Sequence, residues 1–196
     1  MSTDPAALEA SIRVACDQER WSDAATLAVK GYGPELLGYL IGMTRSEVDA
    51  GDAFALCCES IWLGLPKFRW ESTLRTWAYC LARRSFTRLR RDPRRKREVA
   101  YSDALSAAIA QVRTRTATYL RTETKDKVAE LRAKLEPDDQ TLLILRINRK
   151  LPWREIAIVL GEDDDTPAAT ERRAAALRKR FERIKLELRA LAKPAE

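Results

Sequence analysis

The segment Phe68–Arg91 constrains the fold most strongly, because its residue spacing fits an amphipathic helix. Its sequence is FRWESTLRTWAYCLARRSFTRLRR. Ser72 is the expected N-cap, and Pro93 ends the helix because proline lacks a backbone donor and clashes with the preceding turn. Residues at helical spacing form the expected buried face: Leu74, Trp77, Ala78, Leu81, Ser85 and Leu89. The opposite face is expected to carry Thr76, Tyr79, Arg83, Thr87 and Arg90.

Basic residues are concentrated in and after this helix. Residues 67–97 contain twelve Lys or Arg and two acidic residues. So much like charge in one segment favours a polyanionic partner. The loop before the helix holds Phe68, Arg69 and Trp70, whose flat side chains can stack on unpaired bases. The pattern indicates binding of single-stranded or melting DNA. The alternative is a solvated helix face, with Trp70 and Trp77 in the core.

The rest of the chain is also expected to be helical. It is rich in Ala, Leu, Arg and Glu and has seven glycines among 196 residues. The net charge is +7, yet residues 1–66 carry four basic and ten acidic residues. This uneven distribution predicts two domains, with one surface for a protein partner and another for nucleic acid.

The composition argues against an enzyme. The sequence has no histidine, which rules out His-containing zinc sites and Ser-His-Asp or Cys-His nucleophiles. The four cysteines form no C-x-x-C pair, and no glycine-rich phosphate loop occurs. We therefore expect no catalytic residue, no metal and no cofactor. No apolar run reaches transmembrane length and the N-terminus lacks a signal pattern, which predicts a cytoplasmic protein without membrane insertion.

Caps and breaks predict several helices before residue 66. One helix spans about 5–19 and is capped by Asp4, and a second begins at residues 22–23 and is broken by Pro34. A short apolar helix follows that proline. A longer helix begins at Ser46 or Asp49 and ends before Pro66. These helices are expected to pack against the helix at 72–91.

The C-terminal part has the outline of a helix-turn-helix. Expected helices span about 119–135, 138–149, 153–161 and 167–191, the last opened by Thr166-Pro167. In the last helix an apolar stripe should pack inward: Leu177, Phe181, Ile184, Leu188 and Leu191. Arg172, Lys179 and Arg183 should project from the opposite side, with Arg173, Arg178 and Arg180 beside them. The alternative is a basic surface helix or a partner-binding helix.

The segment FRWESTLRTWAYCLARR resembles the second conserved region of sigma-70 family factors, in particular the small extracytoplasmic-function group. It matches, without gaps, the pattern phenylalanine-arginine-x-glutamate-x-serine/threonine-x-x-threonine-tryptophan. The resemblance implies that this region binds the promoter −10 element. The implied DNA-binding residues are Phe68, Arg69, Trp70, Ser72, Arg75, Arg83, Arg84, Arg90 and Arg91.

The resemblance extends upstream to the helix at 49–63. In the family the equivalent helix docks on a coiled coil of the largest RNA polymerase subunit, and it usually contains a glutamine-glutamate pair. Ala55 and Leu56 stand at those two positions here. The residues expected to contact polymerase are Asp49, Asp52, Glu59 and Trp62.

A second match covers LEPDDQTLLILRINRKLPWREIAIVLG, which is similar to the family's fourth region and includes Glu155-Ile156-Ala157. The segment from Leu177 resembles the helix that binds the −35 element. The implied DNA-binding residues are Arg172, Arg173, Arg178, Lys179, Arg180 and Arg183. Fourteen residues separate Gly161 from Ala176, against about four in the family. Either the recognition helix begins earlier, at Pro167, or the acidic loop at 162–165 modulates DNA approach. Acidic residues there also stabilise a helix dipole.

Together these features predict an all-α chain with a sigma region 2-like bundle and a region 4-like helix-turn-helix domain. The expected parts are an N-terminal extension at 1–20, a region 2-like domain at 21–97, a linker at 98–117 and a region 4-like domain at 118–196. The resemblance implies a non-catalytic sigma factor that binds core RNA polymerase and promoter DNA, melts the promoter, and has an anti-sigma factor as an optional partner. The alternatives are a stand-alone helix-turn-helix regulator and a helical adaptor for proteins or acidic membranes.

Overall fold

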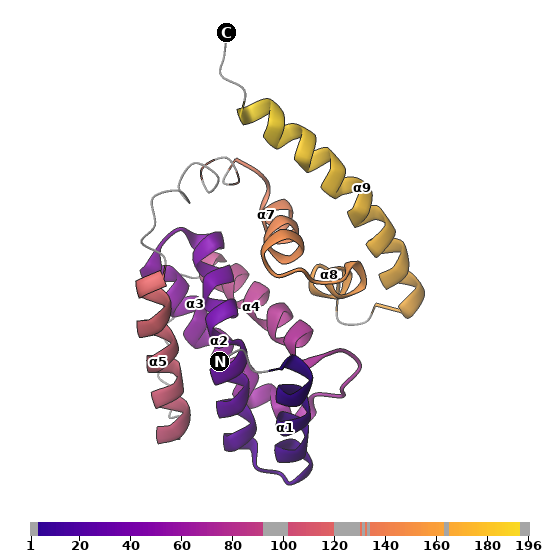
Figure 1. Ribbon diagram of the computed structural model, residues 1–196. Helices are drawn as coiled ribbons and strands as arrows, with labels where there is room; N and C mark the ends of the chain where they lie inside the picture. Colours follow the sequence, from indigo (N-terminus) through magenta and orange to yellow (C-terminus); the bar gives the residue numbers. More distant parts are fainter. Residues whose placement is uncertain are drawn as a thin grey trace. The chain divides into compact units, whose positions relative to one another are not determined.

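The computed structural model describes residues 4–91, 102–119, 130, 132, 134–162 and 165–192. The chain divides into two compact units, Met1–Arg121 and Thr122–Glu196. The described residues of each unit form helices joined by turns and loops, as Figure 1 shows. The prediction of an all-α chain is confirmed. The predicted helix at 119–135 and the basic residues at 94–97 lie almost wholly outside the described residues.

Helix α2 (Trp21–Thr44) is the centre of the first unit. It packs against α1 (Pro5–Asp17), α3 (Glu47–Gly64), α4 (Leu74–Arg91) and α5 (Asp103–Tyr119), as Figure 1 shows. A short 3-10 turn, η1 (Leu65–Lys67), follows α3. The largest fully buried side chains of this unit include Tyr39, Tyr79, Phe54, Leu36 and Leu40. The four surrounding helices therefore share one apolar core with α2.

Two of the expected helix starts are confirmed by their capping bonds. The Asp4 side chain accepts a hydrogen bond from the Ala6 backbone N–H at 3.2 Å, and Pro5 occupies the first turn. The Ser46 hydroxyl accepts from the Asp49 backbone N–H, also at 3.2 Å. A capping bond of this kind stabilises a helix by about 1 kcal/mol.

Pro34 does not break the second helix, contrary to the sequence prediction. Helix α2 continues through it without interruption. A proline inside a helix costs about 3 kcal/mol, because one backbone hydrogen bond is lost and the ring crowds the preceding turn. Burial of Val29, Leu36, Leu37 and Leu40 on both sides of the proline offsets that cost.

The inward face of α4 is wider than predicted. Thr76 and Tyr79 were expected on the exposed face, but both are fully buried. Trp77 and Leu89, expected inside, are only half-buried. The reason is that α4 packs against both α2 and α3, so it is covered from two sides. Its N-cap is also one residue later than expected, because the Thr73 hydroxyl, rather than Ser72, accepts from the Thr76 N–H at 3.1 Å.

The expected linker at 98–117 contains a packed helix. Helix α5 buries Leu105, Ala108, Ile109 and Val112 against the rest of the first unit. Its weak apolar periodicity suggested a linker, but the helix packs closely against α2 at Gly33. A Cβ placed on Gly33 of α2 would lie 2.9 Å from Val112. The first compact unit therefore includes both α1 and α5, beyond the predicted limits of 21 and 97.

The second unit contains α7 (Pro137–Leu143), a π-helical turn η3 (Ile144–Asn148), α8 (Trp153–Val159) and α9 (Pro167–Ala192). Helix α9 packs against α7 and α8. The Thr166 hydroxyl caps α9 by accepting from the Ala169 N–H at 3.2 Å, as the sequence predicts. The core side chains of this unit include Leu142, Leu145, Leu151, Ile156, Leu177 and Ile184.

Within the described part of the chain, every helix is too short or too polar to span a bilayer. Among the same residues, no group of three or more Cys, Asp or Glu side chains could hold a metal ion.

Replacing Leu105 with Ala tests whether α5 belongs to the first unit. Leu105 is fully buried, so Leu105→Ala should lower the free energy of unfolding by about 2–5 kcal/mol. Urea unfolding followed by tryptophan fluorescence suits the measurement, because Trp21, Trp62, Trp70 and Trp77 lie in this unit. Ser106→Ala, at an exposed neighbouring position, is the control. Equal stability of the two variants would mean that α5 is a free tether.

Candidate nucleic-acid interface

An aromatic cluster is formed by the loop before α4, at residues 68–73, and by the first turn of α4. The rings of Phe68 and Trp77 stack with centroids 4.7 Å apart, and Phe68 also contacts Trp70 at 4.9 Å. All three side chains are half-buried, so each keeps part of its surface accessible. Trp77 in turn lies against the end of α3, where a Cβ on Gly64 would come within 2.7 Å of the indole. The expected loop position of Phe68, Arg69 and Trp70 is confirmed.

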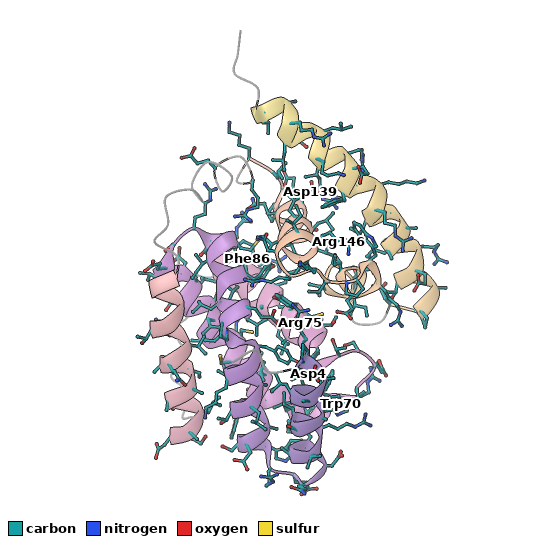
Figure 2. The ribbon with its side chains drawn as sticks, in the orientation of Figure 1. Asp4, Trp70, Arg75, Phe86, Asp139 and Arg146 are labelled. Atoms are coloured by element: carbon teal, nitrogen blue, oxygen red, sulfur yellow. The ribbon has the colours of Figure 1, made fainter. Side chains whose placement is uncertain are left out.

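Trp70 has an unusual backbone conformation. Its φ angle is 58°, in the left-handed region that costs an ordinary residue about 1–2 kcal/mol. The guanidinium carbon of Arg13, from α1, lies 5.3 Å from the centroid of the Trp70 ring, and Figure 2 shows Trp70 in the loop beside this part of the first unit. A cation at this distance attracts the ring face. Phe68 on one side and Arg13 on another therefore hold a conformation that tryptophan rarely adopts.

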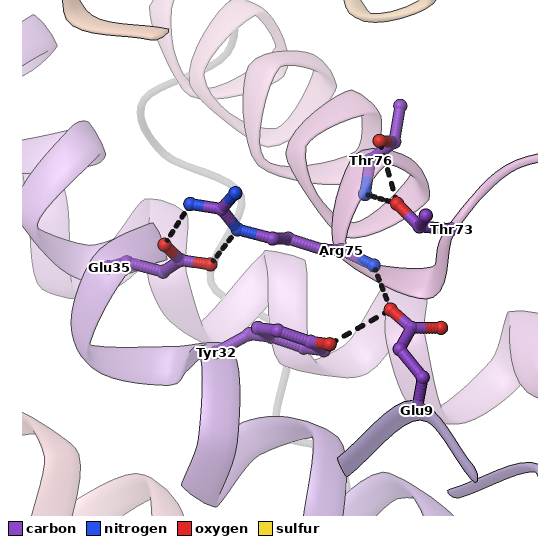
Figure 3. Close-up of polar contacts among 6 residues, drawn as sticks. All are labelled: Glu9, Tyr32, Glu35, Thr73, Arg75 and Thr76. Carbon is purple, nitrogen blue, oxygen red and sulfur yellow. Dashed lines mark hydrogen bonds and ion pairs between the residues drawn. The ribbon is translucent and has the colours of Figure 1, made fainter. Parts of the chain in front are cut away.

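The first turn of α4 is capped by a carboxylate from a distant helix. Glu9 of α1 accepts hydrogen bonds from the Leu74 and Arg75 backbone N–H groups, each at 3.0 Å. Its Oε1 also accepts from the Tyr32 hydroxyl at 2.8 Å (Figure 3). The Leu74 and Arg75 N–H groups lie at the start of α4, where backbone donors have no intrahelical partner. Hydrogen bonds to a charged group contribute about 1.5–3 kcal/mol each, and the negative charge also suits the helix dipole.

Arg75 is occupied by an ion pair with Glu35 of α2. Two of its nitrogens donate to the two carboxylate oxygens at 2.8 and 2.7 Å, as Figure 3 shows. Both side chains are largely buried. Burial and the hydrogen bond to Glu9 raise the pKa of the neighbouring Tyr32 far above its ordinary value, so its hydroxyl remains protonated as a donor. Arg75 was predicted to bind DNA, but in this structure it joins α4 to α2.

The other predicted −10 residues differ in exposure. Arg69, Arg84, Arg90 and Arg91 are exposed, and Arg83 and Ser72 are half-buried. Arg69 forms an exposed ion pair with Glu71 at 3.4 Å, which contributes little to stability. Arg90 lies over the Phe86 ring at 5.7 Å. The aromatic loop thus precedes α4, and the exposed Arg84, Arg90 and Arg91 follow along the same helix.

The predicted polymerase-binding residues are on α3. Asp49 is exposed, and Asp52 and Trp62 are half-buried, so these three reach the surface of the unit. Glu59 is 6% exposed and belongs to the interior instead. The apolar Val48, 70% exposed, extends the accessible part of α3 beside Asp49.

In the second unit, two of the predicted basic residues on α9 pair with acidic side chains. Arg173 forms a bidentate ion pair with Asp165, and Arg180 pairs with Asp139 of α7. Arg173 lowers the pKa of the Asp165 carboxyl below its ordinary value, which keeps it ionised. Arg172, Arg178, Lys179 and Arg183 are exposed and make no ion pair with any residue that the structure describes. These four are available to a partner.

The long turn before α9 is organised by Asp165. Its Oδ2 accepts from the Glu162 N–H at 2.9 Å, and the pair with Arg173 closes the turn onto the helix. A Cβ on Gly161 would lie 2.4 Å from this oxygen, so glycine is needed there. Helix α9 begins at Pro167, which supports the first of the two explanations for the extra residues. Asp165 serves to join the turn to the helix.

An aromatic contact that the sequence did not suggest joins α8 to α9. Trp153 meets Phe181 edge to face at 5.5 Å, and the Arg146 guanidinium lies 4.6 Å from the Trp153 ring centroid. Arg146 also donates to the Leu151 carbonyl at 3.0 Å. Figure 2 labels Arg146 among the side chains of this unit. The π-helical turn η3 holds Arg146 where it can make both contacts.

Comparison with known proteins matches part of the first unit to a protein family. The model of sigma-70 region 2 matches residues 28–96, which span most of α2, all of α3 and α4 and the aromatic loop. The chain is also 31% identical over 133 residues to the RNA polymerase sigma factor YlaC of Bacillus subtilis (strain 168). That match covers 66% of this chain and 75% of the relative.

The chain belongs to the sigma-70 family, in its extracytoplasmic-function group. A search of the solved structures found no match. The region 2 match leaves α1 outside, although Glu9 and Arg13 of this sigma factor contact the loop and helix inside it. Sequence reasoning missed both residues, because nothing in the spacing of α1 indicates a bond to a helix 65 residues away.

The four cysteines of this sigma factor are buried, and none of them forms a disulfide. Burial raises the pKa of the Cys57 thiol to about 12, and it raises that of Cys58 well above the ordinary value. Burial, with the nearby Asp17 carboxylate, also raises the pKa of Cys16. Since the thiolate is the reactive form, these side chains behave as small apolar residues.

Alkylation with iodoacetamide at mildly alkaline pH tests this assignment. In the native protein Cys57 should stay unmodified, because a thiol of pKa about 12 is ionised in only about one molecule in ten thousand at pH 8. In urea all four cysteines should react. Mass spectrometry of the two samples gives the comparison. Rapid native modification of Cys57 or Cys58 would contradict the buried, unreactive assignment.

Proposed function

We propose that this sigma factor binds core RNA polymerase, directs it to a subset of promoters and captures the melted −10 strand with the loop at 68–73. The observation that carries the proposal is the partly exposed aromatic cluster of Phe68, Trp70 and Trp77 at the start of a basic helix. Members of the family are non-catalytic initiation factors. The proposal assigns the individual steps to parts of this chain.

Capture of a DNA strand requires binding free energy that offsets the cost of unstacking a base. Extruding a base costs a few kcal/mol, and each base stacked on an aromatic side chain returns about 1–3 kcal/mol. A cluster of rings fixed before DNA arrives loses little conformational entropy on binding. The exposed Arg84, Arg90 and Arg91 supply positive charge for the phosphates along the same helix. Of the predicted −10 residues, Arg75 is better assigned to holding α4 in place.

Polymerase binding is assigned to α3. Asp49, Asp52 and Trp62 are accessible there, and the exposed Val48 adds an apolar contact at the start of the helix. Interfaces combine such apolar and charged groups at their centre and rim. Buried Glu59 is left out of this surface. The family's glutamine-glutamate pair is absent, with Ala55 half-buried and Leu56 buried at those positions.

Duplex binding is assigned to α9. Its buried side, with Thr170, Ala174, Leu177 and Ile184, faces the unit's own core. Arg172, Lys179 and Arg183 lie on the exposed side at helical spacing, with Arg178 beside them. We propose these four as the −35 contacts. Arg173 and Arg180 are assigned to shaping the unit through Asp165 and Asp139.

Run-off transcription with purified core polymerase and bacterial genomic templates tests the function directly. The wild-type chain should start RNA synthesis at defined sites. Trp70→Ala should impair formation of the open complex by about tenfold, because one base-stacking contact is lost. The closed complex should still form. Permanganate footprinting measures the first and a gel shift the second. Trp21→Phe, on α2 and away from the loop in sequence, is the control. DNA binding that needs no polymerase, with no transcription, would instead indicate a stand-alone regulator.

The salt dependence of duplex binding tests the assignment of α9. Replacing both Lys179 and Arg183 with uncharged residues should change the dependence of duplex affinity on salt. The slope of log affinity against log salt concentration should decrease by about two, because each phosphate contact contributes about 0.9. Arg189→Ala, an exposed residue near the far end of α9, is the matched control and should leave the slope unchanged. Fluorescence anisotropy with a promoter duplex at several salt concentrations gives the slopes. An unchanged slope in the double variant would exclude these residues as phosphate contacts.

A further inference from the structure

The loop at 68–73 and the first turn of α4 are held by α1, which lies outside the region 2 match. Three consecutive N–H groups at the start of α4 have side-chain acceptors. Glu9 accepts from Leu74 and Arg75, and Thr73 accepts from Thr76. Two of these three bonds therefore come from a separate helix. These hydrogen bonds therefore constrain the position of α4 relative to α1.

The Glu9 carboxylate is itself fixed. The Tyr32 hydroxyl donates to its Oε1, and Arg75, whose backbone donates to the same oxygen, is clamped by Glu35 (Figure 3). Tyr32 and Glu35 both come from α2. Glu9 therefore sits in a network that joins α1, α2 and α4. A carboxylate held this way cannot turn away without breaking bonds to two helices.

Arg13 lies four residues after Glu9, on the same face of α1. From there its guanidinium reaches the Trp70 ring at 5.3 Å. The helix therefore contacts both ends of one short segment, with Arg13 at Trp70 and Glu9 at Leu74. Trp70, at the first of these contacts, has a left-handed φ of 58°. Without these contacts the intrinsic preference of tryptophan would favour an ordinary backbone conformation and a different ring position.

We propose that Glu9 and Arg13 are positioning residues for strand capture: α1 fixes the loop at 68–73 in the conformation that presents Trp70 to an extruded base. The inference rests on the proposed function of that loop and adds a role for a helix that need not touch DNA. It assigns the unusual Trp70 backbone to preorganisation, since a ring already in place loses less freedom when it binds.

The substitution Glu9→Gln separates this role from simple packing. Glutamine has nearly the same size, but only one of its two terminal atoms can accept a hydrogen bond. One of the two backbone bonds to α4 is therefore lost, together with the negative charge at the helix N-terminus. At Arg13, Arg13→Gln removes the cation over the ring, and Arg13→Lys keeps it.

The experiment has two arms, each using the full-length chain. The first measures the position of the loop by ¹⁹F NMR of protein labelled with fluorotryptophan, with the Trp70 signal assigned through Trp70→Phe. The second measures, by anisotropy, the binding of the polymerase holoenzyme to a labelled single-stranded oligonucleotide from a mapped start site and to the matching duplex. Asp17→Asn is the control, because it removes one exposed charge from the same helix.

Glu9→Gln and Arg13→Gln should shift or broaden the Trp70 signal and leave those of Trp62 and Trp153 in place. They should weaken single-strand binding by about tenfold, the loss of roughly one stacked base, with duplex binding and core affinity unchanged. Arg13→Lys and Asp17→Asn should behave like the wild type. Thermal unfolding of each variant confirms that it is folded.

The outcomes separate the two proposals. An unchanged Trp70 signal in folded Glu9→Gln and Arg13→Gln overturns the positioning role, whatever the DNA measurements give. Equal loss of single-strand and duplex binding also overturns it, since a general structural defect would act on both. If the wild-type holoenzyme itself fails to bind the single strand, the proposed function of the loop fails, and the positioning role for strand capture fails with it.

Discussion

The first unit depends on the burial of α2 on nearly its whole circumference. Its buried residues include Ala25, Val29, Leu36, Tyr39 and Leu40, which do not fall on a single face. Each large apolar side chain contributes about 1.5–3 kcal/mol when it leaves water. A helix of this kind must be surrounded, and α1, α3, α4 and α5 do so. The surfaces proposed to bind polymerase, on α3, and DNA, on α4, are the remaining sides of helices that cover α2.

Charge has two separate uses in this chain. One group of cations is satisfied internally: Arg75 by Glu35, Arg173 by Asp165 and Arg180 by Asp139. Each of these pairs joins two segments of the same unit. A second group stays exposed at the surface, at Arg90 and Arg91 on α4 and at Arg172, Lys179 and Arg183 on α9. Because a residue in a tight pair must break it to bind phosphate, only the second group suits nucleic acid without a conformational cost.

Local patterns in the sequence predicted many of the helices and several of their starts, but they did not predict α5, which lies in the expected linker. Asp4, Ser46 and Thr166 cap helices as expected, because capping depends on residues within one turn. The prediction for α4 was wrong about Thr76 and Tyr79, since helical periodicity does not say how many neighbours a helix has. The prediction that Pro34 breaks the helix was wrong, because packing against other helices offsets the free-energy cost of the proline.

The candidate site was only partly predictable for the same reason. Phe68 and Trp70 could be found because the aromatic loop and the basic helix are adjacent in the sequence. Glu9 and Arg13 could not, because their contacts with the loop and with α4 join segments that are far apart in the chain. Whether a given arginine is exposed or paired likewise depends on the fold, as Arg75 and Glu35 show.

Gly64 lies between the two surfaces that we propose for polymerase and for DNA in the first unit. It ends α3, and a methyl carbon added to it would lie 2.7 Å from the indole of Trp77, so only hydrogen fits there. Trp77 stacks on Phe68, which contacts Trp70. The end of α3, the helix proposed to bind polymerase, is therefore connected through three contacting rings to the loop proposed to capture a base. On the proposed function, we expect a larger residue at position 64 to disturb this ring contact and so impair promoter opening.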